Sequence, residues 1–183
     1  ARVSGSAGTG KTIVALHRAA HLARTNPDAR ILLTTFSDTL ANALQTKLKR
    51  LLGNEPRLTE RIEVHSLNAI GLRLYAAQIG QAQIASREVL RELINETASV
   101  VDGHKFGPHF LLTEWEQVVD AWQLENWEAY RDVARLGRKT RLPEAQRTIL
   151  WSIFERVRSG LKYRQLITRA ELFSALAGAI STS

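Results

Sequence analysis

The chain has 183 residues, a formal net charge of +7 and a hydrophobic content of 44%. A chain of this length and composition can bury a core of its own and is typical of a soluble globular protein. Cysteine is absent, which excludes disulfides and thiolate metal sites. No secretory signal and no apolar run of the ~20 residues that span a bilayer is recognisable, so we expect a cytoplasmic protein.

Charge is distributed unevenly along the chain. Ten basic and five acidic residues lie in 1–70, six and ten in 71–136, and nine and three in 137–183. The two basic ends suit a polyanionic partner that is bound through its phosphates. Solvated helix faces that are rich in lysine and arginine explain the same pattern equally well.

The first motif lies almost at the start of the chain. Residues 5–12, GSAGTGKT, follow the spacing G-x-x-x-x-G-K-[ST] of a phosphate-binding loop. Glycines let successive backbone N–H groups turn toward an anion, and the following helix adds its N-terminal partial charge. We expect Lys11 to contact the β- and γ-phosphates of ATP and Thr12 to ligate Mg²⁺, which makes both candidate catalytic residues. The candidate nucleotide-binding residues are Gly5, Ser6, Ala7, Gly8, Thr9, Gly10, Lys11 and Thr12.

The elements up to about residue 70 alternate between strands and helices. Short apolar runs predict parallel strands near 2–4, 31–35 and 62–65. Apolar residues at helical spacing predict one helix directly after the loop and another over 37–53. We therefore predict an α/β segment over 1–70.

From residue 71 to 183 the pattern is helical, and no strand is expected. Two capping boxes, Thr113 with Glu116 and Thr168 with Glu171, and a first-turn proline, Pro143, mark expected helix starts. Residues 137–143 look like a linker. The tryptophans are expected mostly in the core, with a helical stripe formed by Trp115, Val118, Val119 and Trp122.

Metal binding has little support in the sequence. His17 and His21 lie four residues apart on the first expected helix, a spacing that can hold a metal. No third ligand accompanies them, and H-R-A-A-H lacks the glutamate of a metalloprotease motif.

Three stretches occur in an order that carries a resemblance. They are RVSGSAGTGKTIVALHRAAHLA, ILLTTFSDTLANALQTKL and IEVHSLNAIGLRL. Together they resemble the N-terminal part of a UvrD/Rep-like superfamily 1 DNA helicase. The resemblance implies a partial RecA-like P-loop NTPase sheet over 1–70. It also implies a mainly helical insertion over 71–183 that returns toward the motor domain at about 168–183.

The resemblance also implies which residues face single-stranded DNA. The second motif of the family matches Thr35, Phe36 and Ser37, and the third matches His65 and Ser66. An aromatic face can stack on a base of any sequence, and hydroxyls can donate to phosphates. Asp38 departs from the asparagine that is usual there, and without the resemblance Phe36 is more simply a core residue.

The implied cofactors are ATP and Mg²⁺. The implied partners are single-stranded DNA or single/double-strand junctions and the second motor domain of the same helicase. The carboxylate motif that would hold Mg²⁺ is not recognisable, and the chain contains no methionine. We therefore expect a piece of a longer helicase that is catalytically incomplete by itself.

Two other functions remain open on the sequence. One is a P-loop ATPase that acts as a switch or signalling module, with a helical part that binds protein. The other is a small nucleotide or metabolite kinase that is complete as it stands; the long strand-free stretch argues against it.

Overall fold

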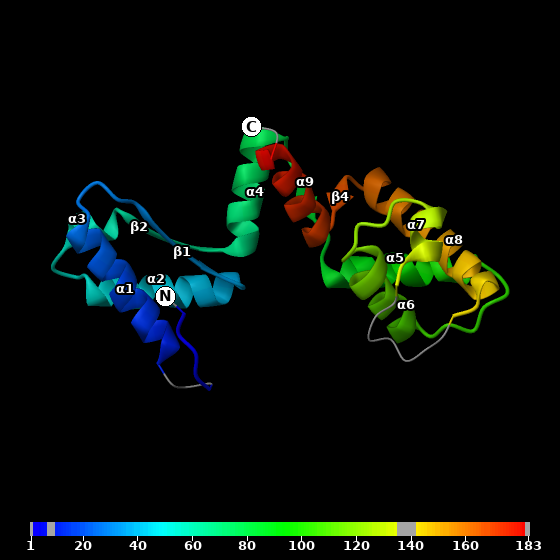
Figure 1. Cartoon of the computed structure of the whole chain (residues 1–183), viewed down its shortest axis with the longest axis horizontal. Coiled ribbons are helices and arrows are strands. Elements are labelled where there is room, and N and C mark those ends of the chain that lie inside the picture. Colours follow the sequence, from blue (N-terminus) through cyan, green and yellow to red (C-terminus); the bar gives the residue numbers. More distant parts are fainter. Residues whose placement is uncertain (1, 7–9, 135–141, 182–183) are drawn as a thin grey trace. The chain divides into compact units, whose positions relative to one another are not determined.

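The computed structural model describes residues 2–6, 10–134 and 142–181. The chain divides into two compact units, Ala1–Gly71 (unit 1) and Leu72–Ser183 (unit 2), and the division falls inside helix α4, Leu67–Gln78 (Figure 1). The described residues are mostly helical, and their strands form two separate parallel pairs. No helix in these ranges combines the length and apolar character that crossing a bilayer requires.

Unit 1 contains one parallel pair of strands among its described residues. Its elements are α1 (Lys11–Thr25), β1 (Ile31–Thr35), α2 (Asp38–Leu51), α3 (Pro56–Thr59) and β2 (Ile62–Ser66). The strands pair from Ile31↔Ile62 to Thr35↔Ser66, which confirms the two strands expected there. The strand expected over 2–4 is wrong: these residues are exposed coil. A strand needs a neighbour to hydrogen-bond with, and none of the described strands pairs with this stretch.

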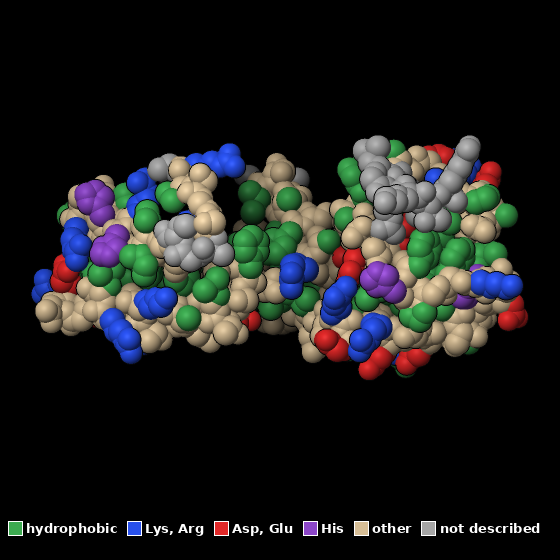
Figure 2. Space-filling model, turned by 90° about the horizontal axis from the view of Figure 1, so that it is seen from below, with side chains coloured by type: hydrophobic (Ala, Val, Ile, Leu, Met, Phe, Trp, Pro, Cys, Tyr) green, Lys and Arg blue, Asp and Glu red, His purple; other side chains and the backbone are tan. Residues whose placement is uncertain are grey.

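The core of unit 1 is built from small and aliphatic side chains. Alanines on α1 let the helix approach the sheet closely, and leucines of both helices fill the remaining space. The buried residues are Leu16, Ala19, Ala20, Ala23, Ala41, Leu44, Leu48, Leu52, Ile62 and Val64. Ile13 and Val14, on the first turn of α1, stay exposed. On the face seen in Figure 2, the charged side chains over unit 1 are mainly Lys and Arg, whereas those over unit 2 are mixed.

Unit 2 is a helical bundle with one short parallel strand pair. Its elements after α4 are β3 (Gln83–Ile84), α5 (Arg87–Ser99), α6 (Pro108–Glu114), the π-helix η1 (Trp115–Val119), α7 (Trp127–Asp132), α8 (Glu144–Tyr163), β4 (Leu166–Ile167) and α9 (Arg169–Ser181). The expectation that no strand follows residue 70 is therefore wrong. Each of these strands has two residues, too few to show a period of two in the sequence.

The expected helix starts of unit 2 are confirmed in part. The Thr168–Glu171 capping box is present, because the Glu171 N–H donates to Thr168 Oγ1 at 3.1 Å and the Thr168 N–H to Glu171 Oε2 at 3.5 Å. The Thr113 box is wrong: Thr113 lies inside α6, which begins at Pro108, and its hydroxyl donates to the carbonyl of His109. Pro143 is the N-cap of α8 and precedes the first turn. Most of the expected linker at 137–143 lies outside the described residues.

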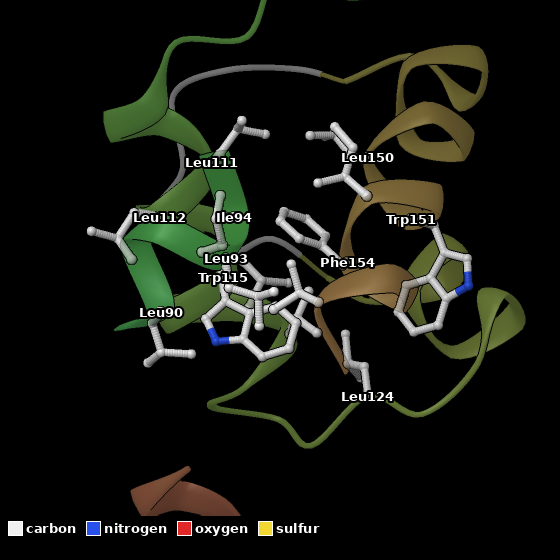
Figure 3. Packing of buried hydrophobic residues seen from close by; sticks show 14 of the residues in the cluster. Leu90, Leu93, Ile94, Leu111, Leu112, Trp115, Leu124, Leu150, Trp151 and Phe154 are labelled. Carbon is white, nitrogen blue, oxygen red and sulfur yellow. The ribbon is translucent and has the colours of Figure 1, made fainter. Parts of the chain in front are cut away.

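An aromatic cluster forms the centre of unit 2. Phe154 points from α8 into the helices that pack against it (Figure 3). Its ring lies 5.8 Å from that of Trp115 and 6.0 Å, edge on, from that of Tyr130. Trp151 stacks on Tyr130 at 5.6 Å.

The expectation that Trp115, Val118, Val119 and Trp122 share one buried helix face is wrong for Trp122. Trp115, Val118 and Val119 are buried, but Trp122 is 65% exposed. The segment from Trp115 to Val119 is a π-helix, whose wider turn changes the angular position of every later residue. Helical spacing of 3.6 residues therefore predicts the wrong face for Trp122.

Candidate functional site

The loop before α1 ends in a glycine with a left-handed backbone. Gly10 is the N-cap of α1 and has a φ of 78°. Residues with a Cβ are strained there, so the backbone explains the glycine at this position of the motif. Ala7, Gly8 and Thr9 lie outside the described residues.

Lys11 closes the described part of the loop. Its Nζ donates to the carbonyl of Gly5 at 2.7 Å and also to that of Ser6. Thr12 follows it as an exposed residue of the first turn. That turn contains no acidic residue, and no side chain caps its N–H groups. The start of α1 therefore combines first-turn N–H groups that have no partner within the helix, the positive end of the helix dipole and a lysine, which together suit a phosphate.

The opposite end of α1 is held against the beginning of β2. Arg61 precedes β2 and donates to the carbonyl of Ala23 at 2.6 Å and to that of Asn26 at 2.9 Å. Arg24, in the last turn of α1, forms an ion pair with Glu55 that lowers the pKa of the Glu55 carboxyl. The start of α1, which follows the loop, is thus the end away from the start of β2 (Figure 1).

The carboxyl ends of β1 and β2 bring the other candidate residues of unit 1 together. Thr35 lies opposite Ser66 in the register, and Thr34 lies opposite His65. Thr35 is 8% exposed and Ser66 only 1% exposed. Two motifs that are separate in the sequence therefore meet at one edge of the sheet.

Hydrogen bonds fix the backbone after each strand. The hydroxyl of Ser66 donates to Asp38 Oδ1 at 2.5 Å and accepts from the N–H of Ala69 at 3.1 Å. The hydroxyl of Ser37 caps α2 by accepting from the N–H of Leu40 at 3.2 Å. Asp38, noted in the sequence only as a departure from the family pattern, thus ties the start of α2 to the end of β2. The pairing of β1 with β2 creates this contact, and no local spacing signals it.

We call Thr35, Phe36, Ser37, His65 and Ser66 the strand-end site; of these, Phe36 and Ser37 are exposed and His65 is partly exposed. Phe36 is 86% exposed and is not part of the core of unit 1. The side chain of His65 is 39% exposed, and its Nε2 lies 3.3 Å from Glu63 Oε2. An exposed ring on a fixed backbone offers a stacking surface, and the imidazole offers a hydrogen-bond donor on the neighbouring strand.

Unit 2 contains a hollow that the sequence did not predict. It has a volume of about 1010 Å³ and lies among η1, the end of α8, the two short strands and the start of α9. On one wall Asp120 accepts hydrogen bonds from Thr168 and Gln123, and burial raises the pKa of its carboxyl. Among the described residues no group of three or more His, Asp or Glu side chains is arranged to hold a metal ion.

Comparison with known proteins identifies the family. A search of curated proteins found no match to the chain. The family model for the UvrD/REP helicase N-terminal domain matches residues 1–175. This match covers both the loop and strand-end residues of unit 1 and nearly all of unit 2. The chain therefore belongs to the UvrD/REP helicase N-terminal domain family.

Proposed function

We propose that the chain supplies the phosphate-binding loop and part of the single-stranded DNA track of an ATP-dependent DNA helicase. The observation that carries the proposal is the parallel register of β1 and β2. This register sets Thr34 opposite His65 and Thr35 opposite Ser66, in the same unit as the loop, and Phe36 and Ser37 directly follow Thr35.

The nucleotide part of the proposal rests on the residues at the start of α1. Lys11 would contact the β- and γ-phosphates, Thr12 would ligate Mg²⁺, and N–H groups around Gly10 would face the phosphate oxygens. The donor set fits a phosphate, because a lysine and the N–H groups of a helix start occur there without a side-chain cap or an acidic residue in the first turn. Bound MgATP would supply the free energy for movement along DNA.

The DNA part assigns different roles to buried and exposed residues. Phe36, with its ring in solvent, would stack on a base, and His65 would reach the backbone of the strand. Thr35 and Ser66 are too buried to contact a DNA strand directly. We assign them a positioning role, in which Ser66 and Asp38 hold the turn that presents Phe36.

In the helicase, residues 1–70 would form part of the first motor domain, and 71–183 would form its helical insertion. A second motor domain would complete both the ATP site and the strand track. Such an assembly would couple hydrolysis to translocation on single-stranded DNA and to duplex unwinding. Catalysis needs a carboxylate for Mg²⁺ and a cation for the developing charge, so we expect no turnover from the chain alone.

Nucleotide binding is tested with a fluorescent ATP analogue and Mg²⁺. Lys11→Ala should weaken binding strongly, whereas Arg18→Ala, which removes an exposed cation from the same helix, should not. Equal binding by the Lys11→Ala protein would contradict the assignment. A turnover near ~1 s⁻¹ that Lys11→Ala abolishes would show instead that the chain is a complete ATPase.

DNA binding is tested by fluorescence anisotropy with labelled oligo-dT. We expect a Kd in the range ~10⁻⁴–10⁻⁶ M at physiological salt, with steep weakening as salt rises. Phe36→Ala should cost about 1–3 kcal/mol of binding free energy. Phe173→Ala makes the same substitution in unit 2 and serves as the control. Unchanged affinity in folded Phe36→Ala protein would remove Phe36 from the track.

A further inference from the structure

The last turns of α8 present an outer face that the strand-end site does not include. We call Arg156, Ser159, Lys162 and Tyr163 the α8 face. Residues three, four and seven positions apart lie on one side of a helix. Arg156, Ser159, Lys162 and Tyr163 are all exposed, whereas Val157 and Leu161 point into the core of unit 2.

Among the large hydrophobic side chains in the described part of unit 2, Tyr163 is the most solvent-exposed. It is 90% exposed, compared with 65% for Trp122. Within the described part of the chain its ring stacks on no other ring and its hydroxyl forms no hydrogen bond. A free aromatic face is therefore available to a partner.

Basic residues are frequent in the sequence around Tyr163. Residues 156–169 contain five Lys or Arg and no Asp or Glu. Arg158 and Arg164 are engaged, the first with the carbonyl of Leu124 at 2.9 Å and the second with Glu96 at 3.0 Å. Arg156 and Lys162 form no ion pair or side-chain hydrogen bond within the described residues. Both are free to meet phosphates.

The hollow described above is a poorer place for a phosphate. Asp120, Glu125 and Glu171 line it, and Glu155 lies on its α8 wall. These carboxylates repel a polyanion. Ser159 and Lys162 of the α8 face also line the hollow, and the exposed Glu155 lies on their side of the helix, whereas Arg156 and Tyr163 are not among the lining residues. Charge therefore favours the side of α8 that carries Arg156 and Tyr163 over the hollow.

We propose that the α8 face binds single-stranded DNA, with a base stacked on Tyr163 and phosphates bound by Lys162 and Arg156. Base–aromatic stacking tolerates any sequence, and the unpaired cations follow the backbone. Arg156 and Tyr163 lie two turns apart, about 10.5 Å along the helix axis, so the face engages a short run of nucleotides. The proposal shares its ligand with the proposed function but rests on different residues.

Stacking is tested by anisotropy with labelled oligo-dT at low salt. Tyr163→Ala should weaken binding about 5- to 150-fold, the equivalent of one base stack. Tyr163→Phe keeps the ring and should bind like the wild type. Trp122→Ala removes another exposed aromatic ring of unit 2 and should leave the affinity unchanged. Unchanged affinity in Tyr163→Ala, or an equal loss in Trp122→Ala, would overturn the proposal, with circular dichroism showing that each variant is folded.

The cations are tested through the salt dependence. Arg156→Gln combined with Lys162→Gln should reduce the slope of log affinity against log salt by about 1.4, because each phosphate contact on a single strand contributes about 0.7. Arg91→Gln combined with Lys105→Gln removes two exposed cations elsewhere in unit 2 and should leave the slope unchanged. Equal slopes for the two double variants would contradict the proposal.

Measuring Tyr163→Ala and Phe36→Ala separately and together keeps the two proposals distinct. A loss with Tyr163→Ala but none with Phe36→Ala supports the α8 face and removes Phe36 from the strand track. A loss with Phe36→Ala alone leaves the proposed function intact and overturns the α8 face. Losses with both, larger in the double variant, support both sites.

Discussion

The two units of this chain bury different kinds of side chain. Unit 1 has a core of alanine, leucine, isoleucine and valine without any buried aromatic residue. Unit 2 buries Trp115, Tyr130, Trp151 and Phe154 in one cluster, with the carboxyl group of Glu114 beside them. Large rings bury more apolar area each, so unit 2 has the larger hydrophobic contribution to stability.

The difference extends to how each unit displays its candidate contacts. In unit 1 they lie where chain segments end: at the start of α1 and at the carboxyl ends of β1 and β2. In unit 2 the accessible ring and cations lie along the outside of one long helix, α8. Unit 1 therefore depends on backbone geometry to position its side chains, whereas unit 2 depends on helical spacing over a well-packed core.

The largest effect is expected from the aromatic core of unit 2. Phe154→Ala should lower the free energy of unfolding by about 3–5 kcal/mol, because a buried ring is removed and a cavity remains. Tryptophan fluorescence during urea unfolding reports this unit alone, since all four tryptophans lie in it. Phe36→Ala, the same change at an exposed ring, should shift the transition by less than about 0.5 kcal/mol. Similar losses of unfolding free energy in Phe154→Ala and Phe36→Ala would contradict the burial of Phe154 and the exposure of Phe36.

A smaller loss is expected from the aliphatic core of unit 1. Leu48→Ala should lower the free energy of unfolding of unit 1 by about 2–5 kcal/mol, since Leu48 is a fully buried residue of α2. Far-UV circular dichroism should record an earlier transition, while tryptophan fluorescence should stay at the wild-type midpoint. Leu40→Ala, at an exposed position of the same helix, is the control. A matching shift in fluorescence would mean that the units do not unfold separately.

The hydrogen bond between Ser66 and Asp38 should have an intermediate effect. Ser66→Ala removes a buried donor from a carboxylate and should cost about 1.5–3 kcal/mol. Ser37→Ala removes the cap of α2 at the same edge and should cost about 1 kcal/mol. Chemical denaturation followed by circular dichroism measures both. A smaller cost for Ser66→Ala than for Ser37→Ala would argue against a positioning role for Ser66.

The smallest effect is a pH dependence confined to unit 2. Burial raises the pKa of Asp120 in the folded state, so the folded protein holds that proton more tightly than the unfolded chain does. This contribution to stability is complete below the unfolded pKa of about 3.9 and is lost as the pH rises through the raised folded pKa. Asp120→Asn should remove this part of the pH dependence of the fluorescence-detected midpoint. Asp102→Asn, at an exposed position, should not.

Much of unit 1 was predictable from its sequence. The loop spacing is a local pattern. The strands expected at 31–35 and 62–65, the helix after the loop and the helix over 37–53 also follow from local patterns, and the structure confirms these strands and helices. The expected strand at 2–4 failed because a strand needs a partner, which a local pattern does not supply. The roles of the site residues in binding ATP, Mg²⁺ and DNA stay predictions.

In unit 2 the sequence indicated helices, but it did not predict where all of them begin, the strand pairing between distant residues or which tryptophans are buried. The capping box at Thr168 is a local signal and was found, whereas the start of α6 at Pro108 was missed. The pairing of Gln83 with Leu166 joins residues far apart in the chain, and each strand is too short to leave a pattern. The π-helix at Trp115 gives no apolar period of its own and moved Trp122 into solvent.

By itself, the sequence determined the phosphate-loop spacing, the succession of strands and helices in unit 1, and the helical character of unit 2. These properties depend on residues within a few positions of each other, where backbone geometry and periodicity act. Only the tertiary structure decided that Ser66 binds Asp38, that Phe36 and Tyr163 stay in solvent, and that Trp115 is buried while Trp122 is not. Those outcomes depend on which distant segments pack together, because burial and long-range hydrogen bonds are properties of the packed chain and not of local spacing.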